Sequence, residues 1–187
     1  MIGRLPKTLE IDGTEYPIRT DYRTVLLIIK AFNDVNLNDI EKTEIMLECL
    51  FINWFEICRN VDIRIACEKA RWFIECGEKW DKSPNNAKLM DWEQDEQLIF
   101  SAINVVANKE VREVEYMHWW TFMGYFKSIG ESVFSTYVNI RKKISKGKKL
   151  EKWEKEIYEQ NIDAIKIKTK LSDKEKEYLK KVGLEVE

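Results

Sequence analysis

Few residues of this chain could carry chemistry, and the first to consider is its only histidine, His118. A histidine acts as a general acid or base only when the fold brings a nucleophile or a reacting group beside it. The sequence contains no G-x-S-x-G, H-E-x-x-H or G-x-x-x-x-G-K-[ST] motif that would supply such partners. We therefore expect His118 to be a hydrogen-bonded core residue, in a chain with no catalytic residues and no cofactor.

The four cysteines, Cys49, Cys58, Cys67 and Cys76, follow one another at intervals of nine residues. Zinc and redox sites use closer pairs, from C-x2-C to C-x4-C, and none occurs here. On one helix, neighbours nine residues apart would face opposite ways, because nine residues make about two and a half turns. We interpret the cysteines as reduced thiols that pack as small apolar side chains, and we predict no metal site.

The basic run over residues 141–149 is the third candidate, and it contains Arg141, Lys142 and Lys143. Such side chains could contact the phosphate groups of a nucleic acid. The alternative is a solvated hinge between two helices. The sequence pI of about 5.7 argues against a nucleic-acid-binding domain, so we treat nucleic acid as the least favoured partner.

Large apolar side chains are densest over residues 115–126, which hold two Trp, two Tyr, two Phe and two Met. A helix that is apolar almost all the way round is either buried or covered by a partner. We predict that this segment forms a helix over about 114–129 at the centre of the core. In that case Trp119, Trp120, Phe122 and Phe126 are mostly buried. The alternative is that these aromatic side chains line an apolar groove for a partner.

The elements around this segment indicate a mainly α fold, a compact multi-helix domain with few long loops. The chain of 187 residues is 44% hydrophobic and has only three Pro and seven Gly. Asp12-Gly13 between two short apolar runs predicts an N-terminal β-hairpin over residues 8–18, with Pro17 on an edge strand. A polar loop is expected over residues 81–91. Helical spacing and capping residues predict further helices over residues 21–32, 38–54, 62–76, 92–106, 131–144, 149–160 and 172–182.

The charge of the chain changes sign near residue 141. Residues 141–187 hold 15 basic and 10 acidic side chains, a net charge of +5, whereas residues 1–140 hold 16 and 23, a net charge of −7. We predict a helical core domain over 1–145 and a basic hinge with a charged helical C-terminal extension over 146–187. The sequence has neither a signal peptide nor an apolar run long enough to span a membrane, so we expect a soluble, cytoplasmic protein.

Several short segments together resemble the bacteriophage gene-product-fifteen family of siphophages and prophages. The segments are densest between residues 92 and 156. They are Trp92 and Asp95 before an apolar helix, then His118–Phe122, Ile129–Glu131, Ile140–Lys143 and Lys149–Glu154.

This resemblance implies a tail assembly chaperone that binds the phage tape measure protein, keeps it soluble and helps to recruit tail-tube subunits such as the major tail protein. It would act in the cytoplasm of the infected or lysogenic host, and a homo-oligomer is compatible with this role. The alternative is a structural tail or connector protein that stays in the virion. The candidate partner-binding residues are Trp119, Trp120, Phe122, Phe126, Arg141, Lys142, Lys143 and Trp153.

Overall fold

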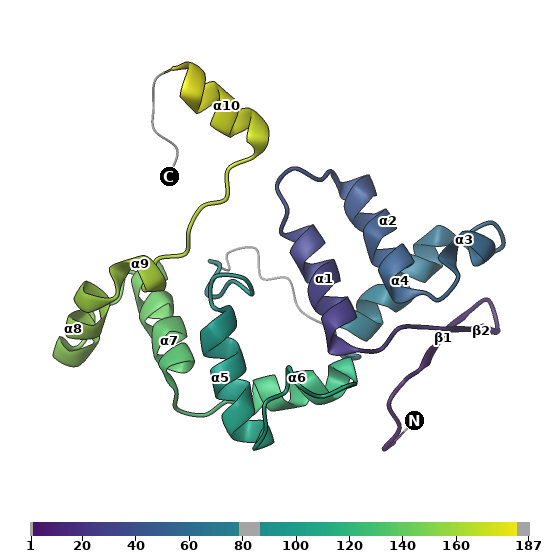
Figure 1. The fold of residues 1–187 in the computed structure, drawn as a ribbon, viewed down its shortest axis with the longest axis horizontal. Coiled ribbons are helices and arrows are strands. Elements are labelled where there is room, and N and C mark those ends of the chain that lie inside the picture. The colour runs from purple at the N-terminus through teal and green to yellow at the C-terminus, as the bar shows by residue number, and fades with distance from the viewer. Residues whose placement is uncertain (1, 79–86, 183–187) are drawn as a thin grey trace.

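The computed structural model describes residues 2–78 and 87–182, and these residues form ten helices and one two-stranded sheet. Figure 1 shows the hairpin and α1 to α4 on one side, α5 and α6 in the middle, and α7 to α9 on the other side. The mainly helical fold with an N-terminal hairpin is confirmed. Of the polar loop expected over 81–91, residues 81–86 lie outside the described residues, and residues 87–91 are not helical.

The hairpin pairs β1 (Thr8–Ile11) with β2 (Thr14–Pro17) in antiparallel register. Asp12 and Gly13 have φ angles of 50° and 78°, and two positive φ angles are what a two-residue type I′ turn requires. Leu9 and Ile11 face the core. Just after β2, Ile18 bridges to Phe51, which fixes the hairpin to the helical body.

Four helices follow the hairpin, and three of them begin at the capping residues that the sequence suggested. The side chains of Asp21, Asn38 and Asp62 each accept hydrogen bonds from the first turn of α1, α2 and α4. The helices are α1 (Tyr22–Phe32), α2 (Asp39–Leu50), α3 (Trp54–Ile57) and α4 (Ile63–Ile74).

The single helix predicted over 38–54 is wrong, because the chain bends between α2 and α3. Asn53 has a positive φ of 59°, and Ile52 N donates to Pro17 O instead of to a carbonyl one turn earlier. The bend thus exchanges helical hydrogen bonds for bonds to the hairpin.

The next three helices are α5 (Glu96–Ala107), α6 (Trp119–Lys127) and α7 (Val133–Ser145), and α6 packs against both α1 and α5. The prediction that the aromatic helix is central is confirmed for Trp119 and Phe122, which are buried, whereas Trp120 and Phe126 are half-buried. The Phe122 ring stacks on Tyr22 of α1 with the ring centroids 4.5 Å apart.

The aromatic helix begins at Trp119, five residues later than predicted. Residues 117–119 pair with residues 20–22 as extended backbone: Trp119 N donates to Thr20 O, and Tyr22 N donates to Met117 O. These strand-like bonds use backbone groups that a longer helix would need for itself. The helix predicted from residue 92 similarly begins only at Glu96, after a turn.

The C-terminal part of the chain holds α8 (Lys152–Gln160), α9 (Ile162–Ile165) and α10 (Asp173–Lys181). A small second core of Tyr137, Ile140 and Ile165 joins α7 to α9. Residues 166–172, which we call the strap, lead from α9 to α10, and α10 has no buried residue. Among the described residues, no helix is long and apolar enough to cross a bilayer.

Candidate protein interaction site

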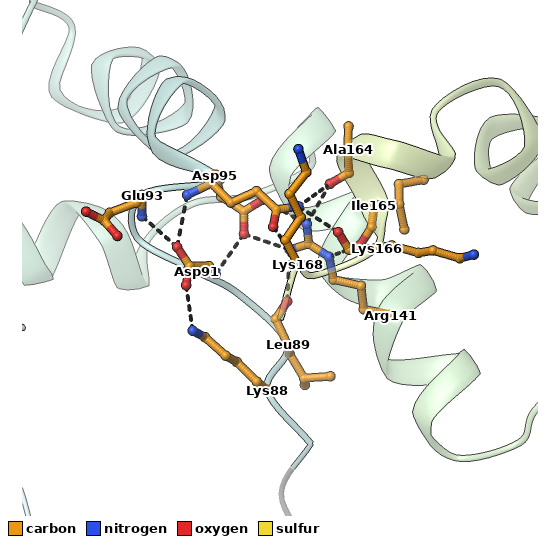
Figure 2. A network of polar contacts seen from close by, with 11 residues as sticks. Lys88, Leu89, Asp91, Glu93, Asp95, Arg141, Ala164, Ile165, Lys166 and Lys168 are labelled. Carbon is orange, nitrogen blue, oxygen red and sulfur yellow. Dashed lines mark hydrogen bonds and ion pairs between the residues drawn. The ribbon is translucent and has the colours of Figure 1, made fainter. Parts of the chain in front are cut away.

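Arg141, the first residue of the basic run for which phosphate contact and a solvated hinge were the two alternatives, is buried with 7% of its surface exposed. The solvated alternative is therefore wrong for this residue. Its guanidinium forms a two-pronged ion pair with Asp95, which is 1% exposed, with Nη1 at 2.7 Å from Oδ2 and Nη2 at 2.8 Å from Oδ1. Figure 2 shows this pair at the centre of a polar network. The geometry is the planar fork that Arg alone offers to a carboxylate.

The remaining N–H groups of Arg141 donate to backbone carbonyls. Nε donates to Ile165 O at 2.6 Å, Nη2 to Ala164 O at 2.9 Å and Nη1 to Leu89 O at 3.1 Å. All five donors of the guanidinium are thereby used. One side chain thus joins α7 to α9, to the start of α5 and to the segment before it.

Two side chains extend the network toward the strap and the turn before α5. Gln94 donates to Ala164 O and Lys166 O and accepts from Lys168 N. Burial of Asp91 disfavours its ionised form. The Lys88 ammonium and two backbone N–H groups of the turn outweigh that effect, so the pKa of Asp91 is about 2. The network fixes the position of α5 and carries no reacting group.

An apolar groove, which we call the α1–α5 groove, runs between α1 and the start of α5 and has a volume of about 450 Å³. Its apolar lining is Tyr22, Leu26, Leu27, Trp92 and Phe100. Charged side chains of both signs surround this lining, and they are Arg23, Lys30, Glu93, Glu96 and Arg112. The groove therefore offers an apolar floor with a charged rim.

Two of the rim cations cover aromatic rings of the groove. The guanidinium of Arg23 lies 4.6 Å from the Tyr22 ring centroid, and that of Arg112 lies 5.1 Å from the Phe100 ring centroid. Arg23 is held in place because it also donates to Val114 O at 2.7 Å. Leu27 is 60% exposed, so the floor presents apolar surface directly to solvent.

A second hollow, which we call the α7–α8 pocket, has a volume of about 390 Å³ and is lined by Lys142, Lys143, Lys146, Lys148 and Trp153, together with Thr136, Asn139 and Glu154. Lys143 is paired with Glu154 at 2.7 Å. That ammonium and the backbone N–H of Glu151 lower the pKa of Glu154. Trp153 is 54% exposed.

The structure places the predicted partner-binding residues in three different environments. Trp119 and Phe122 lie in the core and offer no surface to a partner, and Arg141 belongs to the buried network. Trp120 and Phe126 are half-buried, the latter against Trp92 at 5.0 Å between ring centroids. Only Lys142, Lys143 and Trp153 come together at one exposed place, the α7–α8 pocket.

The sequence reasoning missed the α1–α5 groove altogether, although one signal for it was present. Leu26 and Leu27 follow each other on α1, and only one of them can face the core, so the other points outward. Trp92 belongs to the segments that resemble the phage family, but that resemblance does not mark it as part of a site. Its place beside α1 depends on how the two helices pack, which the sequence does not state.

His118 is buried and caps α6, as expected of a hydrogen-bonded core residue. Its Nδ1 accepts from Trp120 N at 3.0 Å, and its Nε2 lies 2.9 Å from Pro6 O, so the neutral ring with the proton on Nε2 satisfies both contacts. Burial lowers the pKa of His118.

The four cysteines are partly buried and pack against the core, and burial raises the pKa of the Cys76 thiol to about 11. A thiol with that pKa stays protonated at neutral pH, which is consistent with a packing role. Within residues 2–78 and 87–182, no group of His, Cys, Asp and Glu side chains is arranged to hold a metal ion.

A mainly helical domain with an exposed apolar groove and a basic pocket has the features of a binding protein. The chain belongs to the Bacteriophage Gp15 protein family, whose match covers residues 1–167. It is therefore a bacteriophage protein, of a family that suggests a structural or tail-related role. No curated protein and no solved structure matches the chain.

Proposed function

We propose that this protein is a phage tail assembly chaperone that binds the tape measure protein in the α1–α5 groove. It would act in the host cytoplasm as a binding protein, without a catalytic step. Family membership supports a phage assembly role, and the exposed apolar floor of the groove is the observation that carries the proposal.

The chemistry of the groove suits an amphipathic helix. Such a helix can lay its apolar face on Leu26, Leu27 and Trp92, while its polar flanks meet the rim. Because the rim holds Lys30 and Arg112 as well as acidic residues, it can pair with flanks of either charge. A tape measure protein presents long apolar helical faces before the tail tube encloses it, so covering such a face would keep it soluble.

Co-expression with the tape measure protein tests this proposal through a single substitution in the groove. Leu27→Glu puts a charge on the apolar floor, so we expect the soluble yield of the tape measure protein to fall to that of a co-expression without chaperone. The matched control is Val105→Glu, at a residue of α5 that is 80% exposed and does not line the groove. It should leave the yield unchanged.

The assignment of the groove would be contradicted if both variants lowered the soluble yield of the tape measure protein equally. It would also be contradicted if neither variant lowered that yield. The complex should also survive moderate salt, because salt screens charge pairs far more than apolar burial. A mass-spectrometric inventory of purified virions separates the proposal from the alternative. A structural tail or connector protein would be present in the particle, and an assembly chaperone would be absent.

A further inference from the structure

The α7–α8 pocket carries positive charges that no acidic side chain of the described residues pairs with. Among the described residues, no ion pair involves Lys142, Lys146 or Lys148, and all three side chains are exposed. The half-exposed Trp153 ring lies beside them, and the apolar stems of lysines add to its surface. The pocket therefore fits a segment that carries acidic groups together with an apolar side chain.

A surface with that composition lies on α2 of the same chain. Glu41, Glu44 and Glu48 are spaced i, i+3 and i+7, so they share one face of the helix, and all three are exposed. Ile40, one turn before Glu44, is 73% exposed. In the described part of the chain, Glu44 and Glu48 take part in no ion pair. We call these four residues the α2 acidic face.

The two surfaces cannot meet within one molecule. Figure 1 is drawn with the longest axis of the molecule horizontal, and it places α8 at one end and α2 in the opposite half. Two different, complementary surfaces at separate places make a head-to-tail contact. Repetition of such a contact gives a ring or an open chain instead of a closed dimer.

We propose that the α7–α8 pocket binds the α2 acidic face of a second copy of this chain. Lys142, Lys146 and Lys148 would face the glutamates, and Ile40 would rest on the Trp153 ring. The net charges of −7 before residue 141 and +5 from residue 141 onward favour this orientation over head-to-head contact. These net charges also favour a second copy of the chain over a nucleic acid as the partner, because the acidic residues 1–140 would repel a nucleic acid.

Self-association of the purified chain alone tests this inference, so its result is independent of tape measure binding. Sedimentation velocity should show species larger than a dimer as protein concentration rises at low salt. Association should weaken roughly tenfold or more on going to high salt, because the contact depends on exposed charges. A chain that remains monomeric at about 1 mM protein in low salt overturns the inference.

Charge reversal at each surface gives the sharper test. One variant carries Lys142→Glu, Lys146→Glu and Lys148→Glu, and the other carries Glu44→Lys and Glu48→Lys. Each variant alone brings like charges together and should stay monomeric. An equimolar mixture should associate again, because both contacts in an alternating chain of the two variants join opposite charges.

The control variant carries the same change in net charge at three exposed lysines outside the pocket, with the substitutions Lys166→Glu, Lys174→Glu and Lys180→Glu. It should associate as the wild type does. If the mixture of reversed variants stays monomeric although circular dichroism shows both folded, the two surfaces are not partners. Binding of a labelled single-stranded oligonucleotide that is lost with the pocket lysines would instead assign the pocket to nucleic acid and overturn the inference.

Discussion

At the scale of single residues, the energetics of Arg141 follow from its burial. Removing a guanidinium and a carboxylate from water is costly, and their mutual attraction offsets this only when every donor and acceptor is satisfied. Here the five N–H groups of Arg141 have Asp95 and three backbone carbonyls as acceptors. Loss of either partner would leave an unpaired buried charge.

We expect Arg141→Met to lower the free energy of unfolding by about 3–5 kcal/mol, the usual cost of breaking a buried ion pair. The double variant with Asp95→Leu should cost less than the sum of the two single changes, since no charge is then left alone. It should not recover wild-type stability, because Leu89 O and Ile165 O lose their donor, whereas Ala164 O keeps the bond from Gln94. Urea unfolding of the two single variants and the double variant measures these free energies.

Lys142→Met is the matched control, since Lys142 is the exposed neighbour of Arg141. Its cost should stay within about 0.5 kcal/mol, as for other surface positions. Equal effects at both positions would contradict the network. The sequence contains a signal that Arg141 is buried and Lys142 is exposed. Phe134, Tyr137 and Arg141 are spaced i, i+3 and i+7, which places the arginine on the buried face of α7.

His118 should make stability depend on pH in a definite direction. Burial lowers its pKa in the folded state below the ordinary value of about 6.5, so the unfolded chain binds a proton first as the pH falls. Stability linked to this residue is thus fully present above about pH 6.5 and decreases as the pH falls toward the folded-state pKa. Protonation of Nδ1 would also remove the acceptor for Trp120 N.

Replacement of His118 by Asn isolates this effect, because Asn can cap a helix but does not titrate. We expect the wild type to lose more unfolding free energy between pH 7.5 and 5.5 than His118→Asn does, as measured by urea unfolding at both pH values. The variant is less stable overall, since the contact with Pro6 O is lost. Parallel losses in the two proteins would show that other groups cause the pH dependence.

At the scale of elements, two indole N–H groups of α6 donate hydrogen bonds to backbone carbonyls at the C-terminal end of α4. Trp119 Nε1 donates to Ile74 O at 2.8 Å, and Trp120 Nε1 donates to Phe73 O at 2.9 Å. The last carbonyls of a helix have no partner within the helix, so such donors stabilise its end. The paired tryptophans thus fix the angle between two elements that are about 45 residues apart in the sequence.

The two indole hydrogen bonds should differ in strength. Trp119→Phe keeps most of the ring but leaves Ile74 O with only the long contact from Cys76 Sγ at 4.0 Å, beneath a fully buried side chain, and we expect a cost of about 1–3 kcal/mol. Trp120→Phe should cost less, because Phe73 O also accepts from Cys76 N and Trp120 is only half-buried. Thermal unfolding of the two variants gives the order, and the reverse order would contradict this account.

How far the sequence predicts these elements depends on whether the signal is local. The caps Asp21, Asn38 and Asp62 and the Asp12-Gly13 turn were predictable, because each acts within a few residues. The late start of α6 was not, since it depends on pairing with residues 20–22. The α1–α5 groove was missed for the same reason, because it exists only where two helices meet.

At the scale of the whole molecule, the C-terminal elements differ in how they are attached. The residues of α9 share a small core with α7 and accept from Arg141, so α7 and α9 form one packed unit. In the described part of the chain, the hydrogen bonds and ion pairs from the strap and α10 to the earlier elements are all exposed: Gln94 bonds Lys166 O and Lys168 N, Lys170 pairs with Glu93, and Asp173 N donates to Asn36. The family match ends at residue 167, where the strap has begun.

The predicted division between 1–145 and 146–187 can therefore be tested by two shortened chains. Removal of residues 168–187 deletes, among the described residues, only exposed hydrogen bonds and ion pairs, so we expect a loss below about 1 kcal/mol in unfolding free energy. Removal of residues 151–187 also deletes Ile165 and two carbonyl acceptors of Arg141, and it exposes Ile140. That loss should reach about 3–5 kcal/mol, as for a large cavity or a broken buried pair.

Urea unfolding followed by tryptophan fluorescence measures both chains. If the shorter chain is as stable as the longer one, residues 1–150 fold without the elements that follow, which supports the predicted core domain and makes the extension an appendage. If it is strongly destabilised, the boundary lies beyond α9, because the structural unit then includes every element that Arg141 joins. The contacts of Arg141 and Ile165 favour the second result, with the unit ending near residue 167.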